Sequence, residues 1–133
     1  MPPPETVLLV EDDLIDVMSI RRIFRDIPLD NPLVVVSNAE QALTYLRDPA
    51  QPRPGLILLD LNMPRMNGLE FLAAVQHDPA LRSVPVVILS TSDHEDDHRQ
   101  AREYSAAYIL KSLDYAQFLS DIRQLFVDWR ASR

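Results

Sequence analysis

Short apolar runs alternate with stretches of helical periodicity along this chain. The apolar runs predict strands at residues 6–10, 33–36, 56–59, 85–90 and 107–110. The intervening stretches predict helices at residues 14–27, 39–47, 69–76, 95–104 and 113–129, with three- and four-residue apolar steps clearest in the first and the last. Asn38 can cap the second helix, and Asn67 with Gly68 opens the third. Residues 48–55 contain three prolines and are expected to form a loop.

Five strand–helix pairs in alternation predict a parallel sheet with helices on both faces. The predicted strands are continuous runs of Val, Leu and Ile, which is typical of strands that are covered on both sides. We therefore expect an α/β, flavodoxin-like (βα)5 fold with strand order 2-1-3-4-5. No repeat or change of composition marks a second domain. Residues 1–133 are expected to form one domain with its core at about 6–128.

Composition and charge exclude several classes of protein. The chain has 133 residues, of which 47% are hydrophobic and 25% charged, and it contains no cysteine. No apolar run approaches the ~20 residues of a membrane span, and the N-terminus lacks the features of a signal peptide, so we expect a cytoplasmic protein. The net charge of -7 argues against direct DNA binding.

Three of the predicted strands end in charged side chains. Glu11, Asp12 and Asp13 follow the first strand, Asp60 follows the third, and Lys111, the one lysine of the chain, follows the fifth. The carboxyl ends of parallel strands share one edge of the sheet, where ligands bind in such folds. A carboxylate there can attack a phosphoryl donor, provided that a divalent cation and a positive side chain offset the added negative charge. The pattern indicates a phosphoryl-transfer site.

The motifs around these positions resemble the receiver domain of two-component response regulators. They lie at residues 7–13, 58–68, 85–90 and 108–111, and the resemblance covers roughly residues 6–128. It implies that Asp60 accepts a phosphoryl group from the histidine of a partner kinase. It also implies that Mg²⁺, or Mn²⁺, is held by Asp12, Asp60 and the backbone carbonyl of Asn62, with Glu11 acting through a bound water.

The resemblance assigns further roles to the ends of the fourth and fifth strands. Lys111 would hold the phosphoryl oxygens, Ser90 would donate its hydroxyl to them, and Tyr108 would turn inward as the switching aromatic. This would alter the surface made by the fourth helix, fifth strand and fifth helix. Thr91 replaces Ser90 if the register differs by one residue, and Asp13 is expected to cap the first helix.

The chain departs from the family pattern near Lys111. Ser112 stands where the family usually has proline, often after a cis bond, and Ser105-Ala106 replaces a common Gly-Ala pair. The interval from Ser90 to Lys111 is one residue shorter than usual. The Leu-Ser-Thr-Ser and Lys-Ser forms resemble small regulators that are paired with bacterial phytochrome kinases.

This resemblance implies a stand-alone receiver without an output domain, which catalyses only its own phosphorylation and dephosphorylation. Its partners would be a sensor histidine kinase, with a bacteriophytochrome as the candidate, and a downstream protein or phosphotransfer protein. Leu14, Met18 and Arg22 on the first helix are candidate kinase contacts. The end of the last helix, from Phe126 to Trp129, is expected to overhang the sheet and expose an apolar patch for a partner or a homodimer.

Two other functions compete with this interpretation. His94-Glu95-Asp96-Asp97-His98 matches the H-E-x-x-H motif of zinc peptidases. The motif lies in a polar stretch at a helix start, however, and the only other histidine, His77, lies on a different predicted helix. A flavodoxin-like FMN binder is the second alternative, but no Ser/Thr/Gly-rich phosphate loop follows the first strand.

Overall fold

The computed structural model describes residues 5–26, 31–61, 68–91, 94–111 and 114–131. Its strands are β1 (Thr6–Val10), β2 (Leu33–Val36), β3 (Pro54–Asp60), β4 (Val86–Ser90) and β5 (Ala107–Leu110). Its helices are α1 (Leu14–Asp26), α2 (Ala39–Arg47), α3 (Gly68–His77), α4 (Glu95–Glu103) and α5 (Tyr115–Ala131). The strands form one parallel sheet in the order β2-β1-β3-β4-β5, which confirms the predicted flavodoxin-like fold.

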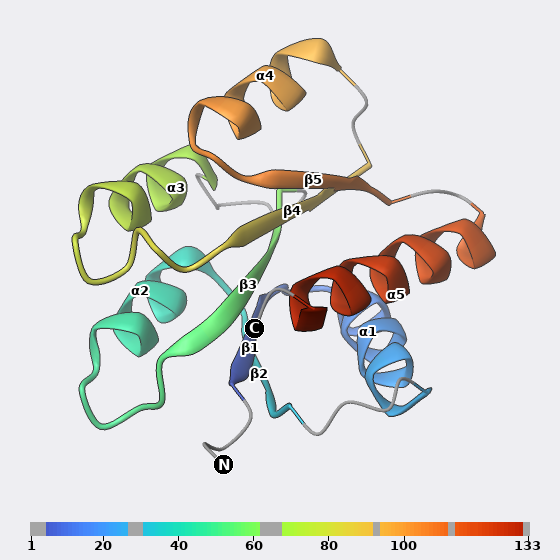
Figure 1. Ribbon diagram of the computed structural model, residues 1–133, viewed down its shortest axis with the longest axis horizontal. Coiled ribbons are helices and arrows are strands. Elements are labelled where there is room, and N and C mark those ends of the chain that lie inside the picture. The colour runs from blue at the N-terminus through green and yellow to red at the C-terminus, as the bar shows by residue number, and fades with distance from the viewer. Residues whose placement is uncertain (1–4, 27–30, 62–67, 92–93, 112–113, 132–133) are drawn as a thin grey trace.

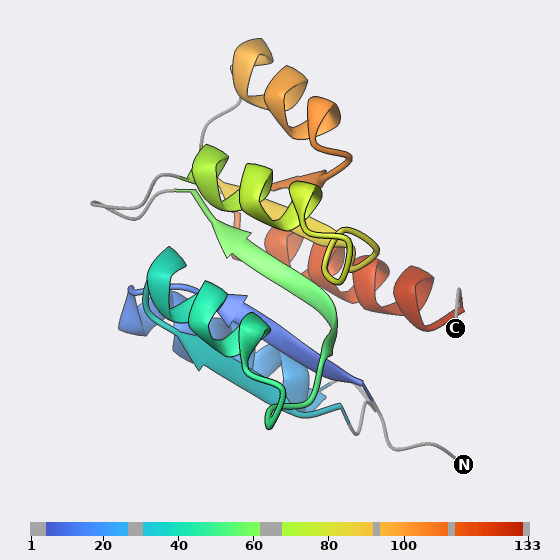
Figure 2. The same cartoon turned by 90° about the vertical axis from the view of Figure 1, so that its left-hand side faces the viewer.

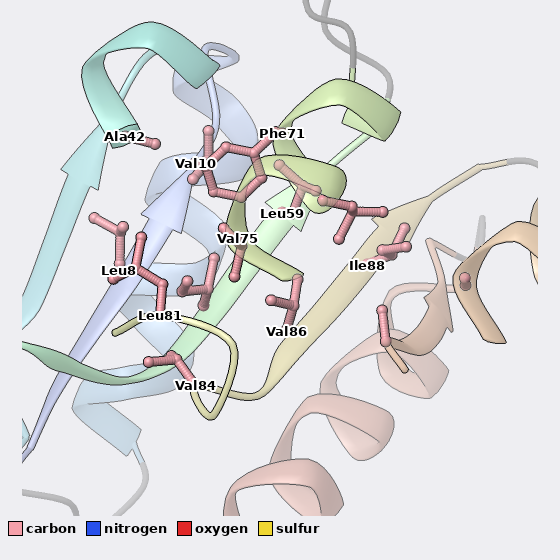
Figure 3. Packing of buried hydrophobic residues seen from close by; sticks show 14 residues of the cluster. Leu8, Val10, Ala42, Leu59, Phe71, Val75, Leu81, Val84, Val86 and Ile88 are labelled. Atoms are coloured by element: carbon pink, nitrogen blue, oxygen red, sulfur yellow. The ribbon is translucent and has the colours of Figure 1, made fainter. Parts of the chain in front are cut away.

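Helices cover both faces of the sheet, as Figures 1 and 2 show. One face packs against α2, α3 and α4, and the other packs against α1 and α5. Alternate side chains of each strand enter opposite layers, so that Leu8 and Val10 join one cluster while Val7 and Leu9 join the other. Figure 3 shows the first cluster, in which Phe71 of α3 lies over the sheet. The central strands β1 and β3 are buried along their whole length, which explains their unbroken apolar sequence.

The strand register brings the carboxyl ends of four strands to one edge. Val10 pairs with Leu59, Asp60 with Leu89, and Ser90 with Leu110. The residues that follow β1 and β5 therefore emerge beside Asp60 and Ser90. This edge carries the charged side chains singled out in the sequence.

The predicted loop at residues 48–55 is wrong at its end, because β3 already begins at Pro54. Proline is tolerated as the first residue of a strand, where its missing N–H breaks no continuing ladder. The pairing between β1 and β3 also shifts register between Thr6 and Val7, so the strand starts irregularly. The other predicted elements are present, and their ends in the described residues differ by no more than two positions.

The connection from α4 to β5 contains a residue in the left-handed region. Ser105 has a φ of 56°. Its N–H donates to the Arg102 carbonyl at 3.0 Å, and the Ala106 N–H donates to the Ala101 carbonyl at 2.8 Å. These two bonds form the Schellman motif that ends many helices, in which glycine usually takes the left-handed position. The departure from the family's Gly-Ala pair therefore puts a side chain at a position suited to glycine.

The end of α5 does not overhang the sheet, so the predicted apolar patch is wrong. Phe126 is fully buried and meets Phe24 edge to face, with ring centroids 4.7 Å apart. Trp129 is also buried, and its Nε1 donates to the Gly55 carbonyl at 3.1 Å. The helix runs back along the sheet as far as the start of β3, and only Val127 in this segment is a large exposed apolar residue. Within the described ranges, no helix is both long and apolar enough to cross a membrane.

Candidate metal-binding site

Three carboxylates converge at the carboxyl edge of the sheet. Glu11, Asp12 and Asp60 each offer an oxygen within 4.8 Å of the others. Glu11 and Asp60 are almost fully buried, whereas Asp12 is exposed. The adjacency of β1 and β3 produces this cluster, because both acids of the 11–12 pair follow β1 directly and Asp60 ends β3. An all-oxygen set with one open side suits a hard divalent cation such as Mg²⁺ or Mn²⁺.

Lys111 reaches into the same cluster from the end of β5. Its Nζ lies 2.9 Å from Glu11 Oε1, 2.9 Å from Asp16 Oδ2 and 3.1 Å from Asp60 Oδ1. Its backbone N–H donates to the Ser90 carbonyl at 2.6 Å, which anchors the residue beside β4. The ammonium donates hydrogen bonds to Glu11 and Asp16, and Asp60 adds a third ion pair.

Burial and the charges of neighbouring groups shift the pKa values of Glu11 and Lys111. Burial raises the pKa of Glu11 to about 8, and its hydrogen bond with Asp60 acts in the same direction against the opposing effect of Lys111. Burial disfavours the Lys111 ammonium, but hydrogen bonds to Asp16 and Glu11 and the charge of Asp60 outweigh burial and raise the pKa of Lys111. At neutral pH Lys111 is therefore charged, and Glu11 holds a proton far more readily than an ordinary glutamate does.

Asp13 caps α1, as predicted for it. Its Oδ1 accepts the N–H of Ile15 at 2.8 Å and the N–H of Asp16 at 3.3 Å. Its own N–H donates to Glu11 Oε2 at 3.4 Å, so the cap also steadies the buried acid.

The two candidate hydroxyls differ in their surroundings. Ser90 is 2% exposed and pairs with Leu110 inside the sheet, whereas Thr91 is exposed. Tyr108 is half-buried on β5, and its ring lies against the ring of His98 on α4 with centroids 4.1 Å apart. Ser90 thus lies at the edge of the cluster, and Tyr108 joins the strand to the neighbouring helix.

Three predicted positions lie outside the described residues: Asn62, the candidate carbonyl ligand, Asn67, expected at the start of the third helix, and Ser112, which follows the lysine. One contact was not foreseen from the sequence. Asp16 binds Lys111 from the first turn of α1, with a side chain that is 40% exposed. A weak signal was present, because Asp16 stands in the first turn of the helix that begins directly after the acids of residues 11–13.

The H-E-x-x-H motif does not assemble a metal site in the described part of the chain. His94 precedes α4 and is exposed, while His98 packs on the sheet side. Glu95, the catalytic glutamate of a zinc peptidase motif, pairs with Arg102 at 2.8 Å instead. His77 lies on α3, where its Nδ1 is 2.7 Å from the Ala73 carbonyl. No group of three metal-ligating side chains among the described residues includes a histidine.

Known proteins are similar to this chain in both sequence and fold. A family profile described as "Response regulator receiver domain" matches residues 7–123. The response regulator Rcp1 of Synechocystis sp. is 33% identical over 132 residues, which are 96% of this chain and 90% of Rcp1. The structure of the phosphorylated cyanobacterial phytochrome response regulator RcpA superposes with a TM-score of 0.89 at 33% identity, covering 98% of this chain and 97% of RcpA. The Mn²⁺-bound form of Rcp1 gives a TM-score of 0.87 at 32% identity, covering 95% and 94% of the two chains.

Proposed function

Because the chain belongs to the family of response regulator receiver domains, we propose that it accepts a phosphoryl group on Asp60 from a sensor histidine kinase. The observation that carries the proposal is the position of Asp60. Its carboxylate is 2% exposed, shares an edge of the sheet with Glu11 and Asp12, and has its Oδ1 3.1 Å from the Lys111 ammonium. A buried carboxylate between acids and an ammonium is suited to an aspartyl-phosphate intermediate.

The transfer exchanges one phosphorus bond for another. A carboxylate oxygen of Asp60 attacks the phosphorus atom of the donor, and the phosphorus–nitrogen bond to the kinase imidazole breaks with its electron pair left on nitrogen. Lys111 Nζ, 3.1 Å from Asp60 Oδ1, would pair with the phosphoryl oxygens, and Ser90 would donate its hydroxyl to them from the end of β4. Hydrolysis reverses the modification, since water attacks phosphorus, releases inorganic phosphate and restores the Asp60 carboxylate. Receiver domains are not enzymes in the usual sense, and this chain would promote only these two steps on itself.

The three acids fit a divalent metal, and Mg²⁺ is the proposed cofactor, with Mn²⁺ as a substitute. Asp12, Asp60 and the carbonyl of Asn62 would hold the ion directly, and Glu11 would act through a bound water. When bound, the ion supplies charge neutralisation for the phosphoryl oxygens. The chain's own contribution is to bury Glu11 and Asp60 side by side, which leaves an excess of negative charge that a cation offsets.

The proposed phosphoryl donor is a sensor kinase of the bacteriophytochrome type. Support comes from the relatives, because RcpA is described as a cyanobacterial phytochrome response regulator and another structural match as a bacteriophytochrome response regulator. The start of α1 lies next to the acids and exposes large apolar side chains to a kinase, among them the predicted contacts Leu14, 76% exposed, and Met18, 65% exposed. Arg22, one turn further along the same helix, is also exposed and would complete the contact.

Output would leave the domain through the surface of α4, β5 and α5. In this proposal Ser90 moves toward the phosphoryl group and Tyr108 turns inward, which separates the Tyr108 ring from His98. The altered surface would be read by a downstream protein, by a phosphotransfer protein or by a second copy of the chain. The net charge of -7 argues against DNA as the direct target. The proposed place of action is the cytoplasm.

Intact-mass measurement after incubation with acetyl phosphate and Mg²⁺ tests the acceptor directly. We expect one added phosphoryl group on the wild type and none after EDTA treatment or in the Asp60→Asn variant, which keeps the shape but loses the nucleophile. Asp26→Asn removes an exposed acid at the end of α1 and serves as the matched control, which should be modified as the wild type is. A phosphoryl group that still appears on Asp60→Asn would contradict the assignment of the acceptor.

A further inference from the structure

Three acidic side chains surround the Lys111 ammonium in the unphosphorylated protein, two of them as hydrogen-bond acceptors. Carboxylates of Glu11, Asp16 and Asp60 lie 2.9, 2.9 and 3.1 Å from Nζ, and the lysine side chain is only 11% exposed. An ammonium donates three hydrogen bonds. Phosphorylation converts the Asp60 carboxylate into an acyl phosphate, so the phosphoryl oxygens take its place and compete with Glu11 and Asp16 for the ammonium.

Asp16 is the partner that can be exchanged at least cost. The Glu11 side chain is 0% exposed, and a buried acid that loses its hydrogen-bond partner cannot turn to water instead. The Asp16 side chain is 40% exposed and belongs to the first turn of α1, so water can solvate it after Lys111 leaves. The position of Asp16 at a helix N-terminus also stabilises its negative charge without the lysine.

We propose that Asp16 is a positioning residue that holds Lys111 in the unphosphorylated protein and competes with the phosphoryl group for the ammonium. The inference rests on the proposed acceptor function and adds a restraint to it. Asp16 stands outside the group of acids that converge on the candidate metal site, so its effect acts through Lys111. Loss of the Asp16 charge should favour the phosphorylated state, because Lys111 then has no ion pair with Asp16 to break before it binds the phosphoryl oxygens.

The single lysine of the chain makes this proposal directly observable. Protein labelled with ¹³C and ¹⁵N only in lysine gives one set of Cε and Nζ resonances. We expect these resonances to differ between the wild type and Asp16→Asn in the presence of Mg²⁺ alone. With beryllofluoride, which mimics the phosphoryl group on a carboxylate, the two proteins should give coincident resonances, since Lys111 has left Asp16 in both. Asp16→Ala, which removes the acceptor completely, should behave as Asp16→Asn does.

The rate of phosphorylation by acetyl phosphate gives a second, independent readout. Asp16→Asn should react about two- to fivefold faster than the wild type, the range that a half-exposed ion pair supports. Asp16→Glu, which can still reach the ammonium, should restore the wild-type rate, and Asp26→Asn should not change it. If Asp16 had a purely structural role, Asp16→Asn would react more slowly than the wild type or at the same rate. Its lysine resonances would then still differ from those of the wild type with beryllofluoride.

The outcomes separate this inference from the acceptor function. Suppose that the wild type takes up phosphate normally while the lysine resonances of Asp16→Asn and wild type differ as much with beryllofluoride as without it. Lys111 then stays bound to Asp16 in both states, and the competition is refuted. An unchanged or slower rate in Asp16→Asn refutes it as well. A wild type that takes up no phosphoryl group and shows no lysine shift with beryllofluoride would overturn the acceptor function itself, and the competition with it.

Discussion

The buried carboxyl of Glu11 should make the metal-free protein less stable as the pH rises. Its pKa is about 8 in the folded protein against an ordinary value of 4.5, because burial and the contact with Asp60 both favour the protonated form. Between these two values the folded chain keeps a proton that the unfolded chain releases. The free energy of unfolding therefore falls by about 1.4 kcal/mol per pH unit from this group alone. The contribution is complete below the lower value and fully lost above the upper one.

Urea unfolding in EDTA at pH 5.5, 6.5 and 7.5 measures this slope, and Glu11→Gln isolates the part that belongs to Glu11. The amide has a similar shape but does not titrate, so the difference between wild type and variant should change by about 1.4 kcal/mol per pH unit. Saturating Mg²⁺ should flatten the decline, because a bound cation favours the charged carboxylate. Equal slopes for wild type and Glu11→Gln, or a wild type that gains stability toward pH 7.5, would refute the reasoning.

Three further substitutions test the packing of the fold by urea unfolding. Ser105→Gly should stabilise the protein by about 0.5–1 kcal/mol, because glycine relieves the left-handed backbone but adds entropy to the unfolded chain; Ser105→Ala should give no such gain. Trp129→Phe should lower the free energy of unfolding by about 2 kcal/mol, because the hydrogen bond to the Gly55 carbonyl and part of the buried volume are lost. Val127→Ala, on the exposed side of the same helix, is the control and should lower it by less than about 0.5 kcal/mol. Ile122→Ala should cost about 2–5 kcal/mol because Ile122 is fully buried, and a cost below 1 kcal/mol would show that the core collapses around it.

The individual strands could be predicted from the sequence because each carries its own local signal, whereas their order was taken from the flavodoxin-like fold. Unbroken apolar runs that end in acids or lysine mark strands covered on both faces, and alternation with helices leaves few ways to connect them. The convergence of Glu11, Asp12 and Asp60 followed from that topology alone, since β1 and β3 are neighbours.

Features that depend on the distance between remote segments were not predictable in the same way. The burial of Phe126 and Trp129 depends on how far α5 extends along the sheet, which its own periodicity does not specify. The start of β3 at Pro54 depends on an irregular pairing with Thr6. The contact between Asp16 and Lys111 joins residues that are 95 positions apart, and a helix face alone does not tell which cation will reach it.

The position of Trp129 determines what an optical experiment on this protein can report. It is the only tryptophan, and it is bonded to Gly55 at the opening of β3, whereas Asp60 closes the same strand. Five residues of extended chain separate the two positions by roughly 16 Å. Intrinsic fluorescence should therefore follow the loss of tertiary structure and stay nearly constant when an ion or a phosphoryl group arrives at the far edge. A second fluorophore near the carboxyl edge would be needed to follow binding by light.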